Sequence, residues 1–87
     1  KVAVFGLGDQ VNYPENFVDG IGILADFMVS SGATLVGKTS TEGYLFEQSR
    51  ALRDGQFLGL AIDIENQSGQ THQRIKDWVE QLRKEFN

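Results

Sequence analysis

The chain is organised around VAVFGLGDQVNY, residues 2–13, in which an apolar run passes directly into a glycine-rich polar loop. The run lacks polar alternation and contains β-branched residues, which is typical of a parallel strand covered on both faces. Gly6 and Gly8 then open the backbone, because glycine permits tight turns and the close approach of a ligand. Ligands of open parallel sheets bind at the carboxyl ends of the strands. The loop after Gly8 is therefore either a candidate lip of a binding site or a strand-to-helix connection whose glycines serve geometry alone.

Length and charge limit the classes of protein to which the chain can belong. Its 87 residues allow one small domain, and a net charge of −4 argues against binding nucleic acid or an anionic membrane surface. It has no cysteine, and so neither disulfides nor thiolate metal sites. No apolar run approaches the length of a membrane span. Because the chain starts at Lys1 with strand residues, we expect an interior piece or a processed form of a longer protein.

Residues 2–37 have the pattern of a βαβ unit. After a strand at 2–5, Pro14 and Glu15 suit the first turn of a helix. Gly32 is expected to end this helix as a left-handed cap, and residues 33–37 indicate the second strand. The apolar face of the helix is expected at Phe17, Ile21, Leu24 and Met28.

A long connection, 38–56, separates this unit from another buried-type run at 57–62. Loops of such length are uncommon in compact domains and are usually functional or carry small elements of their own. We expect a short strand at 44–47, where apolar and polar residues alternate, and a turn at Asp54–Gly55.

The last part of the chain predicts a polar loop followed by a helix. Residues 63–70 are polar, and the helix is expected over 71–86 with Thr71 as its N-cap. His72, the sole histidine, is expected at the surface, because no nucleophile or carboxylate pair accompanies it. We therefore predict no catalytic residue and no metal site. The apolar face of the helix is expected at Ile75, Val79, Leu82 and Phe86, with Trp78 at its border as a packing residue.

These elements and their motifs resemble the flavodoxin family. FGLGDQ at 5–10, followed by Tyr13, resembles the second flavin loop of that family. GKTSTEGYLF at 37–46 resembles its strand five and the excursion after it. FLGLAID at 57–63, with NQS at 66–68, resembles the return strand and its exit loop. The resemblance covers essentially the whole chain, and the excursion is the feature that distinguishes long-chain from short-chain flavodoxins.

The resemblance implies a fold and a cofactor. It implies an α/β, flavodoxin-like, doubly wound parallel sheet, of which residues 1–87 supply only the fourth and fifth strands and their helices, as the carboxyl-terminal part of a single domain. The implied cofactor is flavin mononucleotide (FMN), bound non-covalently where the strand order reverses; flavodoxin is itself the reference example for this placement. The phosphate-binding loop of the family lies outside the chain, which supplies only the second flavin loop.

The resemblance also assigns roles to five residues. Tyr13 would stack on the outer face of the flavin ring, or else it covers the start of the helix. Asp9 would meet the pyrimidine edge of the flavin largely through its backbone, or else it forms an Asx turn. Gly8 would keep that backbone accessible, and Val18 would contribute only a backbone group. Glu65 would lie near the ribityl chain, or else it is a solvated loop charge.

The function implied by the resemblance is that of a low-potential electron carrier rather than an enzyme. Carboxylates near the flavin disfavour adding negative charge to it; the candidates are Asp9, Glu15, Asp19 and Glu65. We expect redox partners with a basic docking surface, such as a ferredoxin/flavodoxin-NADP reductase, and neither nucleic acid nor membrane. The expected location is the cytoplasm, or the plastid stroma of a eukaryotic alga. Two alternatives are a flavodoxin-like FMN domain of a larger reductase and a noncatalytic flavodoxin-like binding module.

Overall fold

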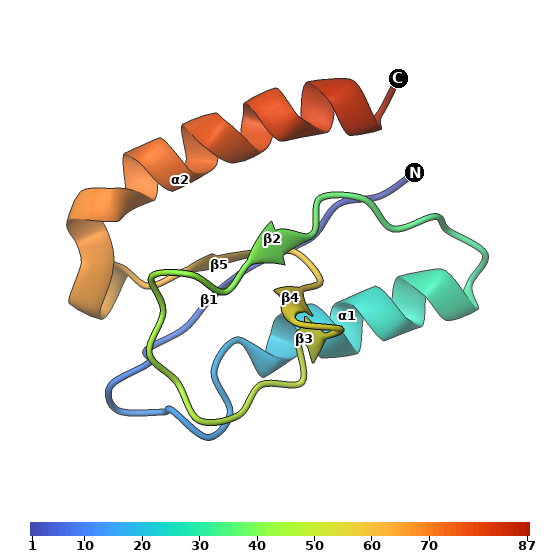
Figure 1. The fold of residues 1–87 in the computed structure, drawn as a ribbon. Coiled ribbons are helices and arrows are strands. Elements are labelled where there is room, and N and C mark those ends of the chain that lie inside the picture. Colours follow the sequence, from blue (N-terminus) through green and yellow to red (C-terminus); the bar gives the residue numbers. More distant parts are fainter.

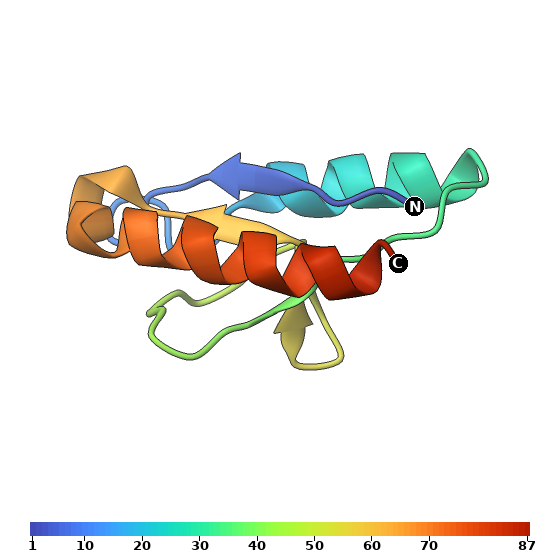
Figure 2. The same ribbon diagram turned by 90° about the horizontal axis from the view of Figure 1, so that it is seen from above.

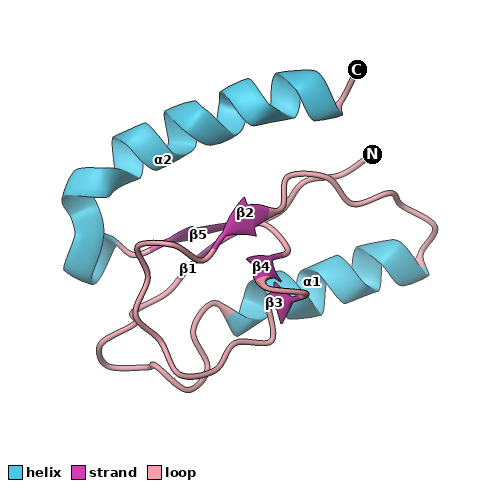
Figure 3. Ribbon diagram, viewed as in Figure 1, coloured by secondary structure: helices cyan, strands magenta, loops and turns pink.

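In the computed structural model, which describes residues 1–87, a short parallel sheet lies between two helices (Figure 1). The excursion, residues 38–59, projects with its hairpin to one side of these layers (Figure 2). Figure 3 shows how much of the chain between the helices is loop. The elements are β1 (Phe5–Leu7), α1 (Asp19–Ser30), β2 (Thr39–Ser40), β3 (Leu52–Arg53), β4 (Gln56–Phe57), β5 (Leu60–Ile62) and α2 (Ile64–Glu85).

The first strand is paired along one edge only. Val2 forms an isolated parallel bridge with Leu35, and β1 then pairs in parallel with β5, with Phe5 opposite Leu60. Residues 38–59 are thus inserted between two segments that pair with the same edge. No strand pairs with the other edge of β1. The predicted second strand at 33–37 is reduced to the bridge, because the chain turns away into the excursion.

The apolar run predicted a first strand covered on both faces, but only one of its faces is covered. Val4 is buried, but Phe5 is 63% exposed and Leu7 is 65% exposed. Successive side chains of a strand point to opposite faces, so Val4 and Gly6 face α1 while Phe5 lies on the α2 side, with its ring edge-on to Trp78. Apolar residues therefore lie at the rim of the sheet where no further strand covers them.

Helix α1 begins at Asp19, so the predicted start at Pro14 is wrong. The carbonyl oxygen of Pro14 instead accepts hydrogen bonds from the main-chain N–H groups of Glu47 (2.7 Å) and Gln48 (3.0 Å). Because residues 14–17 run beside the excursion, they are not free to form a helical turn. Helix formation starts only where this contact ends.

The buried face of α1 differs in part from the predicted face. Leu24 was expected inside but is 45% exposed. A Cβ on Gly22 would overlap the carbonyl oxygen of Arg50, so this glycine lets the excursion lie directly on the helix. The predicted left-handed cap at Gly32 is confirmed by its φ of 97°. The helix residues that are buried are Ile21, Gly22 and Ala25.

The excursion has its own small sheet, which confirms the expectation of local elements there. Its three strands pair antiparallel in the order β2-β4-β3. The predicted turn is also confirmed, since Asp54 and Gly55 join β3 to β4 with φ values of 54° and 80°. Positive φ at both central residues is the requirement of a type I′ hairpin turn.

The predicted strand at 44–47 is absent, although its aromatic residues are still used for packing. Tyr44 and Phe46 place their rings 5.1 Å and 5.3 Å from the ring of Phe57. Phe17 completes this cluster from the segment before α1. The alternation in this segment thus reports contact with an aromatic core rather than strand pairing.

Helix α2 begins at Ile64, so the predicted loop at 63–70 and the N-cap at Thr71 are wrong. Asp63 is the N-cap, and its side chain accepts a hydrogen bond from the main-chain N–H of Asn66. The helix is kinked at Gln67, whose φ is −135°. His72 is exposed, as predicted. Neither helix combines the length and the apolar character that a membrane span requires.

Candidate functional site

A hollow of about 360 Å³ opens where β1 and β5 end. Four of the five predicted site residues lie around it, and the ring of Tyr13 is 63% exposed there. Two apolar residues that were not predicted, Leu7 and Ile64, complete the lining. The full lining is Leu7, Gly8, Asp9, Tyr13, Ile64 and Glu65.

Val18, the fifth predicted residue, lies behind this hollow rather than around it. Its side chain is 5% exposed, in the core. A Cβ on Gly8 would lie 2.7 Å from Cγ1 of Val18 and 2.8 Å from the ring of Phe17. Val18 also has a φ of 47°, which is rare for a β-branched residue. The lack of a side chain at Gly8 therefore lets Val18 and Phe17 pack directly against the main chain of the loop.

The carboxylate of Asp9 is turned into its own loop as an Asx turn. Oδ1 accepts hydrogen bonds from the main-chain N–H groups of Val11 (3.1 Å) and Asn12 (3.0 Å), and Oδ2 accepts one from the side chain of Asn12 (2.8 Å). The side chain of Asn66 adds a fourth at 2.8 Å. Led by the main-chain N–H of Asn12 and then by the amide of Asn66, these bonds favour the charged form and lower the pKa of Asp9 to about 2.

The main chain of Asp9 is less engaged than its carboxylate. Its carbonyl oxygen accepts a hydrogen bond from the N–H of Tyr13 (2.9 Å), and its own N–H has no partner within the protein. The two readings of Asp9 are thus compatible, because an Asx turn that uses the carboxylate leaves the backbone N–H available to a ligand.

A buried pair, Asp63 and Gln10, ties this loop to the start of α2. Asp63 accepts from the main-chain N–H of Gln10 (3.0 Å) and from its side-chain amide (2.9 Å). Burial raises the pKa of Asp63, but the hydrogen bonds from Gln10 and Asn66 outweigh it and lower the pKa overall. The side-chain oxygen of Gln10 in turn accepts from the N–H of Leu45 (2.5 Å). The loop, the start of α2 and the excursion are therefore joined at one point.

The sequence reasoning assigned no site role to Asp63 or Asn66. The signal that could have found them is an aspartate at the end of an apolar run, the residue type preferred at an N-cap. Its capping bond goes to a residue three positions later, where Asn66 lies.

Two of the predicted carboxylates do not reach the hollow. Glu15 and Asp19 lie beside a different one, next to Arg50. Asp19 accepts a hydrogen bond from the main-chain N–H of Arg50 at 2.8 Å, and its carboxylate is 3.8 Å from that residue's guanidinium. Of the four predicted carboxylates, only those of Asp9 and Glu65 therefore belong to residues that line the candidate site.

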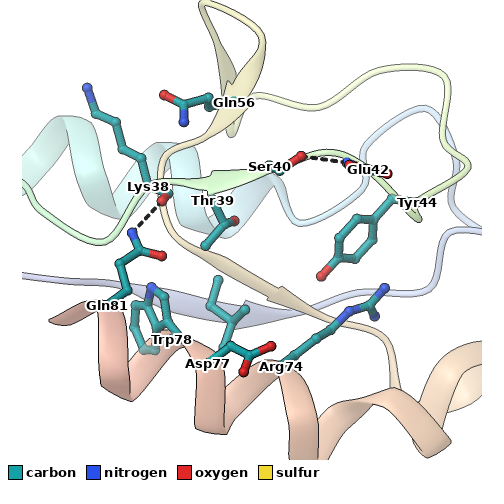
Figure 4. A pocket seen from close by; sticks show the side chains of 11 residues that line it. Lys38, Thr39, Ser40, Glu42, Tyr44, Gln56, Arg74, Asp77, Trp78 and Gln81 are labelled. Atoms are coloured by element: carbon teal, nitrogen blue, oxygen red, sulfur yellow. Dashed lines mark hydrogen bonds between the residues drawn. The ribbon is translucent and has the colours of Figure 1, made fainter.

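A second hollow, of about 480 Å³, lies between the excursion and α2 (Figure 4). The guanidinium of Arg74 lies 4.0 Å above the ring of Tyr44, the indole N–H of Trp78 donates to the carbonyl oxygen of Gly37, and Gln81 donates to that of Lys38. These contacts hold the excursion against α2, so we assign these side chains a structural role. Its lining is Lys38, Thr39, Ser40, Glu42, Tyr44, Gln56, Leu60, Arg74, Asp77, Trp78 and Gln81. No group of three His, Cys, Asp or Glu side chains is placed to hold a metal ion.

No family model matches the chain. Known proteins, however, match nearly its whole length. It is 51% identical over 86 residues to a flavodoxin of Trichodesmium erythraeum and 54% identical over 85 residues to one of Nostoc sp.. These matches take in 99% and 98% of this chain and 50% of each relative, so the chain spans about half the length of the curated relatives it matches.

A solved structure agrees in fold. The crystal structure of Fusobacterium nucleatum flavodoxin bound to flavin mononucleotide superposes with a TM-score of 0.94 at 44% identity, covering 99% of this chain and 52% of that one. The predicted flavodoxin-like α/β fold with a parallel sheet is thereby confirmed. Sequence and fold together show that the chain belongs to the flavodoxin family and spans about half the length of these relatives.

Proposed function

We propose that the chain forms one lip of the FMN site of a low-potential electron carrier. The observation that carries the proposal is the exposed ring of Tyr13 at a hollow lined by Leu7 and Ile64. A flat aromatic ring beside apolar side chains suits a flat heteroaromatic ligand. The structural relative from Fusobacterium nucleatum, which binds FMN, supports the choice of ligand.

The residues present fit one side of a flavin. Tyr13 offers a stacking face, and the N–H of Asp9 is a donor without a partner in the protein. The flavin supplies the redox chemistry when it is bound, and the protein binds it and adjusts its electronics. Gly8 and Val18 support the loop from behind. We propose that the remaining contacts, including those to the phosphate, come from the other half of the domain.

We propose that Asp9 and Glu65 make the reduction potential low. Negative charge at the lip disfavours a further negative charge on the bound ring. The low pKa of Asp9 keeps its carboxylate charged at any pH near neutrality. Water and salt screen both charges and so limit their contributions. The effect is strong for Glu65, because this residue is exposed.

We propose that the partners are redox proteins with a basic surface, such as a ferredoxin/flavodoxin-NADP reductase, met in the cytoplasm. Acidic residues outnumber basic ones by 12 to 8 in this chain. Complementary charge orients two proteins during a brief encounter while adding little lasting affinity. This is the requirement of a carrier that must bind, transfer an electron and leave.

A titration of flavin fluorescence tests the proposal. In a fusion protein, this chain would follow the amino-terminal half of the Nostoc flavodoxin, and the 87-residue chain alone would serve as the comparison. We expect the fusion protein to bind one FMN tightly and to be yellow, and the chain alone to bind FMN poorly. A folded fusion protein that does not bind FMN would contradict the proposal.

A further inference from the structure

We propose that Asn66 is a positioning residue for the flavin lip: its side-chain amide fastens the Asp9 turn to the start of α2 and so fixes the main chain that meets the flavin. The inference rests on the proposed function, because it gives Asn66 a purpose at that same site. Asn66 does not line the hollow itself. It acts through Asp9.

The side-chain nitrogen of Asn66 lies between two carboxylates. It is 2.8 Å from Oδ1 of Asp9, and 2.9 Å and 3.1 Å from the two carboxylate oxygens of Asp63. An amide has two N–H donors and can serve both acceptors at once. Two carboxylates held this close would otherwise repel each other. The amide of Asn66 therefore offsets the repulsion and joins the ends of β1 and β5.

Asn66 donates the only hydrogen bond to the Asp9 carboxylate from outside the loop. The other three hydrogen bonds come from Val11 and Asn12, which move with Asp9. The next residue, Gln10, is bound separately to Asp63. Without Asn66 the turn would keep its internal shape, but it would lose its attachment to α2 at Asp9.

Two substitutions separate this role from simple packing. Asn66→Ala removes the donor and should weaken FMN binding by about tenfold, the lower end of the effect of losing one hydrogen bond to a charged group. Asn66→Asp keeps the shape but places a third carboxylate between Asp9 and Asp63, so it should weaken binding more than alanine does. If the side chain only filled space, the aspartate variant would bind FMN as tightly as the parent.

A matched control comes from the same helix. The amide of Gln73 donates to the carboxylate of Asp77 at 2.7 Å on the exposed face of α2. Gln73→Ala therefore also removes an amide-to-carboxylate hydrogen bond, but one remote from the lip. We expect it to leave FMN binding unchanged.

The experiment combines fluorescence titration of FMN with a carbon-13 NMR titration of Asp9 in the fusion protein and its variants. In Asn66→Ala the pKa of Asp9 should rise from about 2 but stay below the ordinary 3.8, because the larger contribution of Asn12 remains. Alanine and aspartate variants that bind FMN like the parent would overturn the proposal, and so would an unchanged pKa of Asp9.

The two proposals can fail separately. If the parent fusion protein folds but does not bind FMN, the proposed function fails, while the Asp9 titration still decides whether Asn66 fastens the turn. If the parent binds FMN and the Asn66 variants bind it equally tightly, this inference alone fails. Thermal unfolding followed by circular dichroism identifies a variant that does not fold. Should Asn66→Asp be one, the alanine variant carries the test.

Discussion

Replacing Gly8 with alanine tests how the core supports the flavin lip. A Cβ at this position would meet Cγ1 of Val18 at 2.7 Å and two ring carbons of Phe17 at 2.8 Å and 2.9 Å. Both side chains are buried and cannot move into solvent. The loop must therefore shift outward, or the core must deform.

The expected cost follows from this crowding. Overpacking a core costs about 1–3 kcal/mol, and three contacts this short place Gly8→Ala near the upper end. The loss of backbone freedom in the unfolded chain returns about 0.4–1 kcal/mol. We therefore expect a net loss of roughly 2 kcal/mol in the free energy of unfolding, together with weaker FMN binding.

Urea unfolding of the flavin-free fusion protein, followed by circular dichroism, measures this loss. Gly20→Ala is the matched control, because a Cβ there meets nothing within 4 Å and α1 should gain up to about 1 kcal/mol in helix propensity. The reasoning would be refuted if Gly8→Ala were as stable as the parent and bound FMN equally well.

Four further predictions follow from the same structure. Tyr13→Ala should weaken FMN binding in a fluorescence titration by about 1 kcal/mol or somewhat more, while Tyr13→Phe loses much less and His72→Ala loses nothing; equal affinity of the alanine and phenylalanine variants would exclude stacking. The isolated chain should self-associate in analytical ultracentrifugation, because one edge of β1 is unpaired and apolar residues lie beside it; a stable monomer at high concentration would contradict this. Asp63 has a pKa below the ordinary 3.8 in the folded state, so its stabilisation is present above that pH and is lost as the pH falls through the lower folded value; urea midpoints should show a weaker acid dependence for Asp63→Asn than for the parent. Glu15→Lys and Glu65→Lys should retain FMN but slow stopped-flow reduction by a basic reductase at low salt, with the difference shrinking near 0.1 M salt, where screening acts over about 10 Å; rates that ignore both salt and substitution would rule out steering by these carboxylates.

Local signals in the sequence predicted those parts of the fold that local chemistry controls. Asp54–Gly55 forms the hairpin turn because both residues tolerate positive φ. Gly32 caps α1 for the same reason. The strand predicted at 2–5 is a parallel bridge at Val2 followed by the strand at Phe5–Leu7, and its burial was overestimated. Burial depends on neighbours in the sheet, and one edge of β1 has none.

The errors arose where tertiary contacts override local propensity. Pro14 suits a helix start, yet its carbonyl oxygen is held by the excursion. The polar residues after Asp63 resemble a loop, but Asp63 caps a helix that continues through a kink. That error also hid Asn66, because a loop residue gave no reason to expect it between two carboxylates. The family resemblance named Tyr13, Asp9 and Glu65, and all three line one hollow because they follow strand ends that lie at the same edge of the sheet.

Nitrogen-15 NMR spectra of the fusion protein, recorded with and without FMN, test the flavin lip most directly. A stacked flavin ring shifts the resonances of nearby N–H groups, so the largest changes should fall on residues 7–13 and on Ile64 and Glu65. Residues around the hollow of Figure 4, such as Lys38 and Gln81, should change little. Large changes at Lys38 and Gln81, with residues 7–13 unmoved, would contradict the assignment of the site.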